Sequence, residues 1–165
     1  MKKIKMLVIP SDNHGCGRFR SIWPHKWMAE NMSDIFDIDI MYSFPKDVNL
    51  EAFLSKYDIV HIHKQLDKNC QIANMIKFLG IKLIVDVDDN YFLSPQHPMY
   101  ASARAEHWEK PIMEHLRLAD MCSTTTSTFI PLKLKIILRC INQCIKLLMI
   151  RCININKFNI QCINQ

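Results

Sequence analysis

Short apolar runs alternate with amphipathic segments from residue 4 to about residue 128, and this alternation constrains the fold more than any other feature. Each apolar run has the length and β-branched composition of a strand, and the segments between the runs have the apolar spacing of helices. Strands and helices in this order form a parallel sheet with right-handed crossovers. The sequence therefore predicts an α/β, Rossmann-like parallel sheet with flanking helices in residues 1–128.

Five strands, of which the fifth is either a short strand or a strand-like turn, and four helices are predicted in this region. Pro24 falls in the first turn of the first helix, where its missing N–H is tolerated, and Gly80 suits a left-handed cap at the end of the third. The stretches 11–19 and 90–107 are predicted to be loops. The predicted strands are 4–10, 35–44, 57–64, 81–89 and 121–127, and the predicted helices are 21–32, 49–57, 68–80 and 110–120.

Polar residues gather where the predicted strands end. In open parallel sheets, ligands bind outside the carboxyl ends of the strands. The sequence therefore predicts a binding site at that edge. The residues that would form it are the stretch 11–17, His63 and Lys64 after the third strand, Asp88 and Asp89 after the fourth, and hydroxyls at 124–127.

The stretch "GCGRFR" invites comparison with a dinucleotide-binding loop. That fingerprint needs a third glycine where this chain has Arg20, and an acidic residue after the second strand, where this chain has "MYS". Gly15 and Gly17 still allow backbone amides to approach an anionic or hydroxylated ligand, and Arg18 and Arg20 could bind phosphate or carboxylate. The alternative is a tight turn with solvated arginines.

Two further motifs carry histidines and carboxylates. His61 and His63 share one face of a strand, but no third zinc ligand is apparent, so we expect His61 in the core and His63 as the acid–base or substrate-contact candidate. In "DVDD", Asp86 and Asp88 also share a face. An Asp-x-Asp pattern either holds a divalent metal with a sugar nucleotide or binds loop amides.

Composition separates the chain into two parts. The formal net charge is +5, but six of the 21 basic residues and none of the 16 acidic residues lie in 129–165, so residues 1–128 carry a net charge of −1. This balance does not favour a nucleic-acid-binding protein. The cysteines of 1–128 are isolated and no secretory signal is apparent, so we expect a cytoplasmic location.

The segment 129–165 has ten isoleucines, five asparagines and four cysteines, with no acidic residue and no glycine. Its cysteines lack zinc-site spacing, and basic residues interrupt every window that could span a membrane. One interpretation is a basic amphipathic helix that contacts the inner face of an anionic membrane. The preferred hypothesis is a reading-frame shift near residues 128–130, because a low-GC message read out of frame has this composition.

Four stretches together resemble a known family. "GCGRFRSIWPHKWMAE", "YDIVHIHKQ", "KLIVDVDDNYFLSPQHPMY" and "LADMCSTTTST", in this order, resemble the N-terminal domain of GT-B-fold glycosyltransferases of the retaining, family-four-like group. The resemblance covers roughly residues 2–128. It implies a parent enzyme that transfers a sugar from a nucleotide-sugar donor to a glycan, lipid-linked or protein acceptor in a cleft between two Rossmann-like domains, with no required metal or other cofactor.

The resemblance also implies residue roles. Gly15 and Gly17 would face the donor phosphates, Arg20 would lie near the phosphates or the acceptor, and Lys64 would bind substrate. His63 would be the catalytic residue at the cleft, with Asp88 and Asp89 on the acceptor side. The segment 129–165 lacks the basic donor-binding residues and paired glutamates of such enzymes, so we expect this chain alone to be inactive. The alternative is a non-enzymatic Rossmann-like module that binds a ligand or partner.

Overall fold

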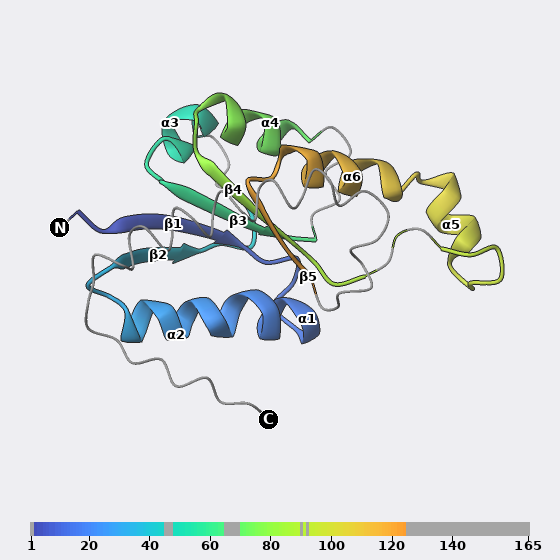
Figure 1. Cartoon of the computed structure of the whole chain (residues 1–165), viewed down its shortest axis with the longest axis horizontal. Helices are drawn as coiled ribbons and strands as arrows, with labels where there is room; N and C mark the ends of the chain where they lie inside the picture. The colour runs from blue at the N-terminus through green and yellow to red at the C-terminus, as the bar shows by residue number, and fades with distance from the viewer. Residues whose placement is uncertain (1, 45–47, 65–69, 90, 92, 125–165) are drawn as a thin grey trace.

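The computed structural model describes residues 2–44, 48–64, 70–89, 91 and 93–124. Its centre is a five-stranded parallel sheet with the strand order β2-β1-β3-β4-β5, as Figure 1 shows. The α/β, Rossmann-like prediction is therefore confirmed. The strands are β1 (Ile4–Ile9), β2 (Phe36–Ile40), β3 (Ile59–His63), β4 (Lys82–Val87) and β5 (Met121–Thr124).

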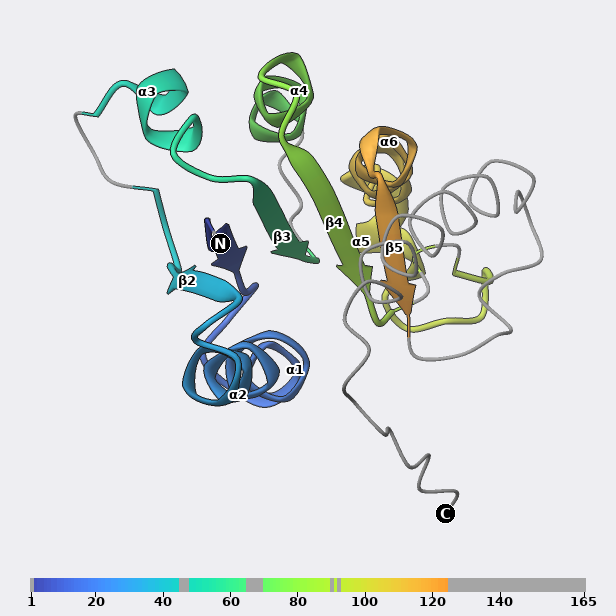
Figure 2. The same cartoon turned by 60° about the vertical axis from the view of Figure 1, so that its left-hand side comes forward.

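Helices cover both faces of the sheet (Figure 2). One face carries α1 (Gly15–Gly17), the π-helical turn η1 (Arg18–Ile22) and α2 (Trp23–Asn31). The other carries α3 (Leu50–Leu54), α4 (Gln71–Phe78) and α6 (Glu109–Leu118), while α5 (Tyr100–Ala105) lies beyond the carboxyl ends of the strands. The main core lies under α3, α4 and α6. It includes the buried strand residues Leu7, Val60, Ile62, Leu83 and Val85, which alternate with residues of the opposite face.

The first predicted loop is largely helical. The sequence predicted a loop at 11–19, yet Gly15–Gly17 and the π-helical turn from Arg18 lead directly into α2. Pro24 gives a physical reason for the wide turn: its nitrogen has no hydrogen to donate to the carbonyl of Arg20, so regular α-helical bonding cannot run through this point. The prediction was wrong because a helix beginning before Pro24 has no simple sequence signal.

The second predicted loop also contains a helix. Tyr100–Ala105 forms α5 within 90–107, and its sequence "YASARA" is rich in the strong helix former alanine. The cap at Gly80 is confirmed, since its φ is +71°. The expectations for 125–127 and for the segment 129–165, whether irregular or helical, fall outside the described residues.

Among the described residues, no helix is long and apolar enough to cross a membrane.

Candidate functional site

A row of polar side chains crosses three neighbouring strands on one face of the sheet. The strand register pairs His63 of β3 with Asp86 of β4, and Asp86 with Ser123 of β5. Because paired residues in a parallel sheet point to the same face, the three side chains lie beside one another near the carboxyl ends of the strands. The topology places this row next to β1, where the strand order reverses between β2 and β3.

His63 is held in one orientation at the centre of the row. Its side chain is completely buried, and Nδ1 lies 3.0 Å from Oγ of Ser11. Ser11 donates its own proton to Asp12, at 2.7 Å, so the Ser11 oxygen accepts a hydrogen bond from Nδ1–H. The other nitrogen, Nε2, faces two carboxylates at 3.7 Å (Asp86) and 3.6 Å (Asp88). It has no hydrogen-bond partner among the described residues.

Arg20 binds the carboxylate of Asp86 through two hydrogen bonds. It extends from the π-helical turn, and its Nε donates to Oδ2 at 2.7 Å while Nη2 donates to Oδ1. Ser123 donates to the same carboxylate, which is 2% exposed. The hydrogen bond with Asp86 raises the pKa of Arg20. Such a fork fixes both groups, since a buried carboxylate left without its cation would be strongly destabilising.

Lys64 lies at the end of β3 in a left-handed conformation, with φ of 53°. Its ammonium is 3.2 Å from Oδ1 of Asp88 and also contacts Asp89. Burial lowers the pKa of Lys64, but the bonds with Asp89 and Asp88 outweigh this and raise it, so the ammonium stays charged. Burial likewise raises the pKa of Asp88, yet hydrogen bonds from Cys16 and Lys64 leave it lowered.

The glycine loop packs against Asp12. The Asp12 carboxylate accepts hydrogen bonds from Ser11, from the backbone N–H of His14 at 2.9 Å and from the N–H of Gly17, and these bonds lower its pKa. A Cβ atom at Gly17 would lie 2.2 Å from the Asp12 carbonyl oxygen, so only glycine fits there. Gly15 is needed for a different reason, its positive φ of 25°. The N–H groups of His14 and Gly17 are therefore directed at Asp12.

His61, two residues before His63 on the same face, is buried as the sequence predicted, but its Nδ1 has no hydrogen-bond partner among the described residues. Its ring packs 4.7 Å from that of His25, and burial lowers the pKa of His61 to about 3. The imidazole is therefore neutral in the folded protein at physiological pH.

The structure brings five of the predicted site residues into one cluster: Arg20, His63, Lys64, Asp88 and Asp89. Gly15 and Gly17 belong to the adjoining helix α1. Sequence reasoning included Ser11 and Asp12 only as part of the stretch 11–17, and Asp86 only as a member of the Asp-x-Asp pattern, without the partners that the structure gives them. Only the strand register reveals the row that Asp86 and Ser123 share with His63, and no sequence pattern specifies that register.

Exposure separates the cluster into an outer and an inner part. The side chain of Asp89 is 56% exposed, and those of Lys64 and Arg20 are 26% and 22% exposed. His63 lies behind them, so its direct contact with a ligand requires a covering side chain to move. The catalytic role of His63 stays a prediction, and the structure shows only that its Nε2 lies near the carboxylates of Asp86 and Asp88 without a hydrogen bond to either.

No group of three or more His, Cys, Asp or Glu side chains is arranged to hold a metal ion in the described ranges. Asp86 is occupied by Arg20, and Asp88 by Lys64. Comparisons of the chain with family models, with curated proteins and with solved structures found no match.

Proposed function

We propose that residues 1–128 are the acceptor-side domain of a GT-B glycosyltransferase. The parent enzyme would transfer a sugar from a nucleotide-sugar donor to a glycan, lipid-linked or protein acceptor. The observation that carries the proposal is the carboxylate-rich cluster at the strand ends. Three aspartates, at 86, 88 and 89, contact two cations, Arg20 and Lys64, and Asp12 adjoins the cluster through Ser11 and His63.

The charge balance of this cluster favours binding of the acceptor over binding of the nucleotide-sugar donor. An excess of carboxylates disfavours the phosphates of a nucleotide sugar, whereas carboxylates are good acceptors for the hydroxyl groups of an acceptor. In this proposal Asp89, Lys64 and Arg20 meet the acceptor because they are the exposed members of the cluster. A second, donor-binding domain of the parent enzyme would supply the cations that bind the diphosphate.

Sequencing the gene from codon 120 through several hundred bases beyond the stop tests this proposal. A glycine-rich domain with paired glutamates in another frame would support it. The restored enzyme should release nucleoside diphosphate as sugar is transferred. The variant His63→Asn should lower kcat by about 10²-fold or more if the imidazole takes the acceptor proton, and much less if it only positions the carboxylates. Tight binding of a nucleotide sugar by the present chain alone would contradict the proposal.

A second candidate is a non-enzymatic module that contacts a membrane, and one observation favours it. Phe19, Trp23 and Trp27 recur every four residues on η1 and α2, and each is more than half exposed. Exposed aromatic side chains beside a lysine, here Lys26, suit a membrane interface.

Vesicle co-sedimentation separates the two candidates. The full chain is mixed with vesicles of phosphatidylcholine and phosphatidylglycerol, in parallel with the double variant Trp23→Ala/Trp27→Ala and with a chain that lacks residues 129–165. Salt-sensitive binding that either change abolishes would favour the module. Absence of binding would leave the glycosyltransferase domain as the better account.

A further inference from the structure

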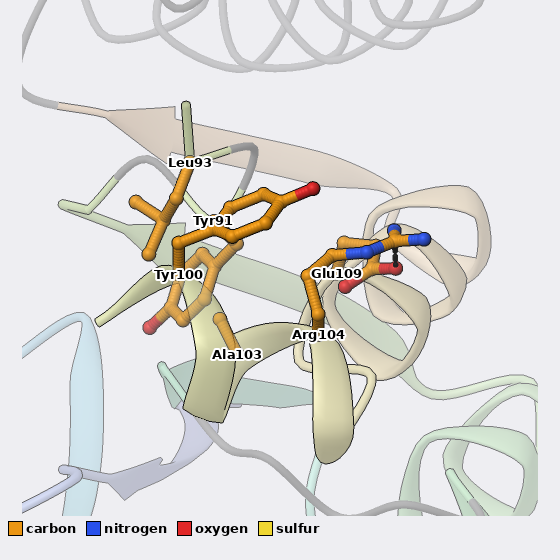
Figure 3. A pocket seen from close by; sticks show the side chains of 6 residues that line it. All are labelled: Tyr91, Leu93, Tyr100, Ala103, Arg104 and Glu109. Atoms are coloured by element: carbon orange, nitrogen blue, oxygen red, sulfur yellow. Dashed lines mark hydrogen bonds and ion pairs between the residues drawn. The ribbon is translucent and has the colours of Figure 1, made fainter. Parts of the chain in front are cut away.

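A small pocket lies next to the cluster, between the residues after β4 and the helices α5 and α6 (Figure 3). Its volume is about 180 Å³. The side chains that line it are Tyr91, Leu93, Tyr100, Ala103, Arg104 and Glu109. Two tyrosine rings and two aliphatic side chains make one part of the wall apolar, and Arg104 and Glu109 make the opposite part polar (Figure 3).

The polar part of the wall carries no net charge. Nη1 of Arg104 lies 3.2 Å from Oε1 of Glu109, so the two groups neutralise each other. An isolated phosphate would gain little here, because its attraction to Arg104 is offset by Glu109. The ion pair still offers the remaining N–H groups of the guanidinium and the second carboxylate oxygen as hydrogen-bonding groups for a neutral ligand.

Tyr91 supplies a buried hydroxyl with an unmet hydrogen-bonding need. The residue is 8% exposed, and its hydroxyl has no hydrogen-bond partner among the described residues. Leaving a buried polar group unpaired is costly. In Figure 3 the hydroxyl extends toward the side of the pocket where Arg104 and Glu109 lie. Because the oxygen itself is covered by protein, a ligand hydroxyl would become its partner only after a side chain over it moves.

The volume limits the ligand to a single ring. Pockets for drug-sized molecules measure roughly 300–1,000 Å³, and this one is smaller. A nucleoside diphosphate would not fit and would find no net positive charge. A neutral ring with an apolar face and several hydroxyls matches both the tyrosine rings and the polar wall.

We propose that this pocket binds one neutral sugar ring of a glycan acceptor. The inference rests on the proposed function, and it selects the glycan from the acceptor classes named there. Its position fits that role, since Tyr91 follows Asp89 by two residues and lies within the electrostatic influence of Lys64, Asp88 and Asp89. Burial raises the pKa of Tyr91 to about 12, which keeps the phenol protonated as a donor at neutral pH.

Saturation-transfer NMR on the full chain tests the pocket directly, with the methyl glycosides of glucose, galactose and mannose at millimolar concentration. We expect saturation transfer to at least one glycoside. Removal of the ring in Tyr100→Ala should abolish it, and Tyr91→Phe, which keeps the ring, should weaken binding about fivefold. Tyr42→Ala is the matched control, because Tyr42 is 55% exposed and does not line the pocket.

Three outcomes would overturn the inference: no saturation transfer to any glycoside, equal transfer in the Tyr91→Phe chain, or preference for adenosine over all three glycosides. The results that would contradict the proposed function differ from those that would contradict the pocket assignment. If a glycoside binds the pocket but no reading frame of the gene encodes a donor domain, the pocket assignment stands and the glycosyltransferase proposal fails. A restored enzyme that glycosylates only a protein or lipid-linked acceptor would overturn the pocket assignment alone.

Discussion

At the scale of single residues, Gly17 has less room for a side chain than Gly15 or Gly80. Replacing it with alanine would place Cβ 2.2 Å from the backbone oxygen of Asp12. The Gly17→Ala chain should lose about 1–3 kcal/mol of unfolding free energy, measured by urea denaturation, because backbone rather than a flexible side chain must move. Gly80→Asn serves as control, since Gly80 has φ of +71° and open space around it, and asparagine tolerates that conformation. An equal loss in both variants would contradict this account.

The buried His61 makes stability depend on pH. Its pKa is about 3 in the folded protein and ordinarily 6.5, so between these values the unfolded state binds a proton that the folded state does not. Stability therefore falls as the pH drops below 6.5, by about 2 kcal/mol at pH 5. Burial lowers the pKa of His25 as well, which acts in the same direction.

Replacing His61 tests whether its imidazole causes the pH dependence of stability. In His61→Leu the loss of unfolding free energy between pH 8 and pH 5 should be smaller than in the unchanged chain, as measured by urea denaturation at each pH. His14→Gln, at an exposed position, should keep the full pH dependence. A His61→Leu curve parallel to that of the unchanged chain would locate the effect elsewhere.

Residue identity alone predicted much of the candidate site but not its bonding. Lys64, Asp88 and Asp89 were predicted because strand ends of a parallel sheet meet at one edge, and they do lie together. The partner of Arg20 was not predictable. Arg20 and Asp86 are 66 residues apart in sequence, and their pairing depends on the side chain of Arg20 reaching from the π-helical turn to β4.

At the scale of elements, Asp120, which directly precedes β5, links the helix α4 to the strand β4. Its carboxylate accepts a hydrogen bond from the N–H of Leu83 in β4 at 2.9 Å, and Nζ of Lys77 in α4 lies 2.6 Å away. Its own N–H donates to the carbonyl of Leu83. Burial raises the pKa of Asp120, but the bonds from Leu83 and Lys77 outweigh it and leave the pKa lowered.

Asp120→Asn should therefore cost about 1–3 kcal/mol of unfolding free energy at pH 7. A depressed folded-state pKa gives stability that is present above 3.8 and lost as the pH falls further, so the difference between the two chains should narrow in acid. Thermal unfolding at pH 7 and pH 3 measures both effects. Lys82→Gln is the control, because Lys82 is 61% exposed and its ion pair should contribute at most about 1 kcal/mol. A smaller loss in Asp120→Asn than in Lys82→Gln would refute the linking role.

The elements themselves were largely predictable, and the errors have local causes. Four strands were found because a buried parallel strand is a short apolar run with turn residues after it, and the stretch left open as a strand or a strand-like turn is the strand β5. The ends were less certain: the second predicted strand spans 35–44, but pairing with β1 holds only Phe36–Ile40 in the sheet. The helix α5 was missed because the residues around it are polar and rich in proline, which conceals its alanines.

At the scale of the whole molecule, the two faces of the sheet are unequally covered. On the face of the polar row, the described helices are α1, η1 and α2, which lie beside β1 and β2 in Figure 2. Ile84 of β4 and Met121 of β5, neighbours in the register on that face, stay partly exposed. In a parallel sheet both faces are ordinarily covered, so this is the part of the described sheet with the least cover.

A chain that ends at residue 128 tests whether the segment 129–165 contributes to the described fold. If that segment is the product of a frame shift, it adds nothing to the described fold, and removing it should leave the unfolding midpoint unchanged. Solubility should rise, because isoleucine-rich runs with no acidic residue favour aggregation. Thermal unfolding followed by circular dichroism, with sedimentation before and after heating, measures both quantities.

The shortened chain needs a control for length alone, which a chain ending at residue 146 supplies. Equal midpoints in all three chains would support the frame-shift hypothesis and make residues 1–128 the folding unit. A midpoint lowered by several degrees in the shortest chain would mean that 129–165 contributes to the folded state. The partly exposed face around Ile84 and Met121 would then be the first surface to examine, and the segment would have to be treated as a genuine part of the protein.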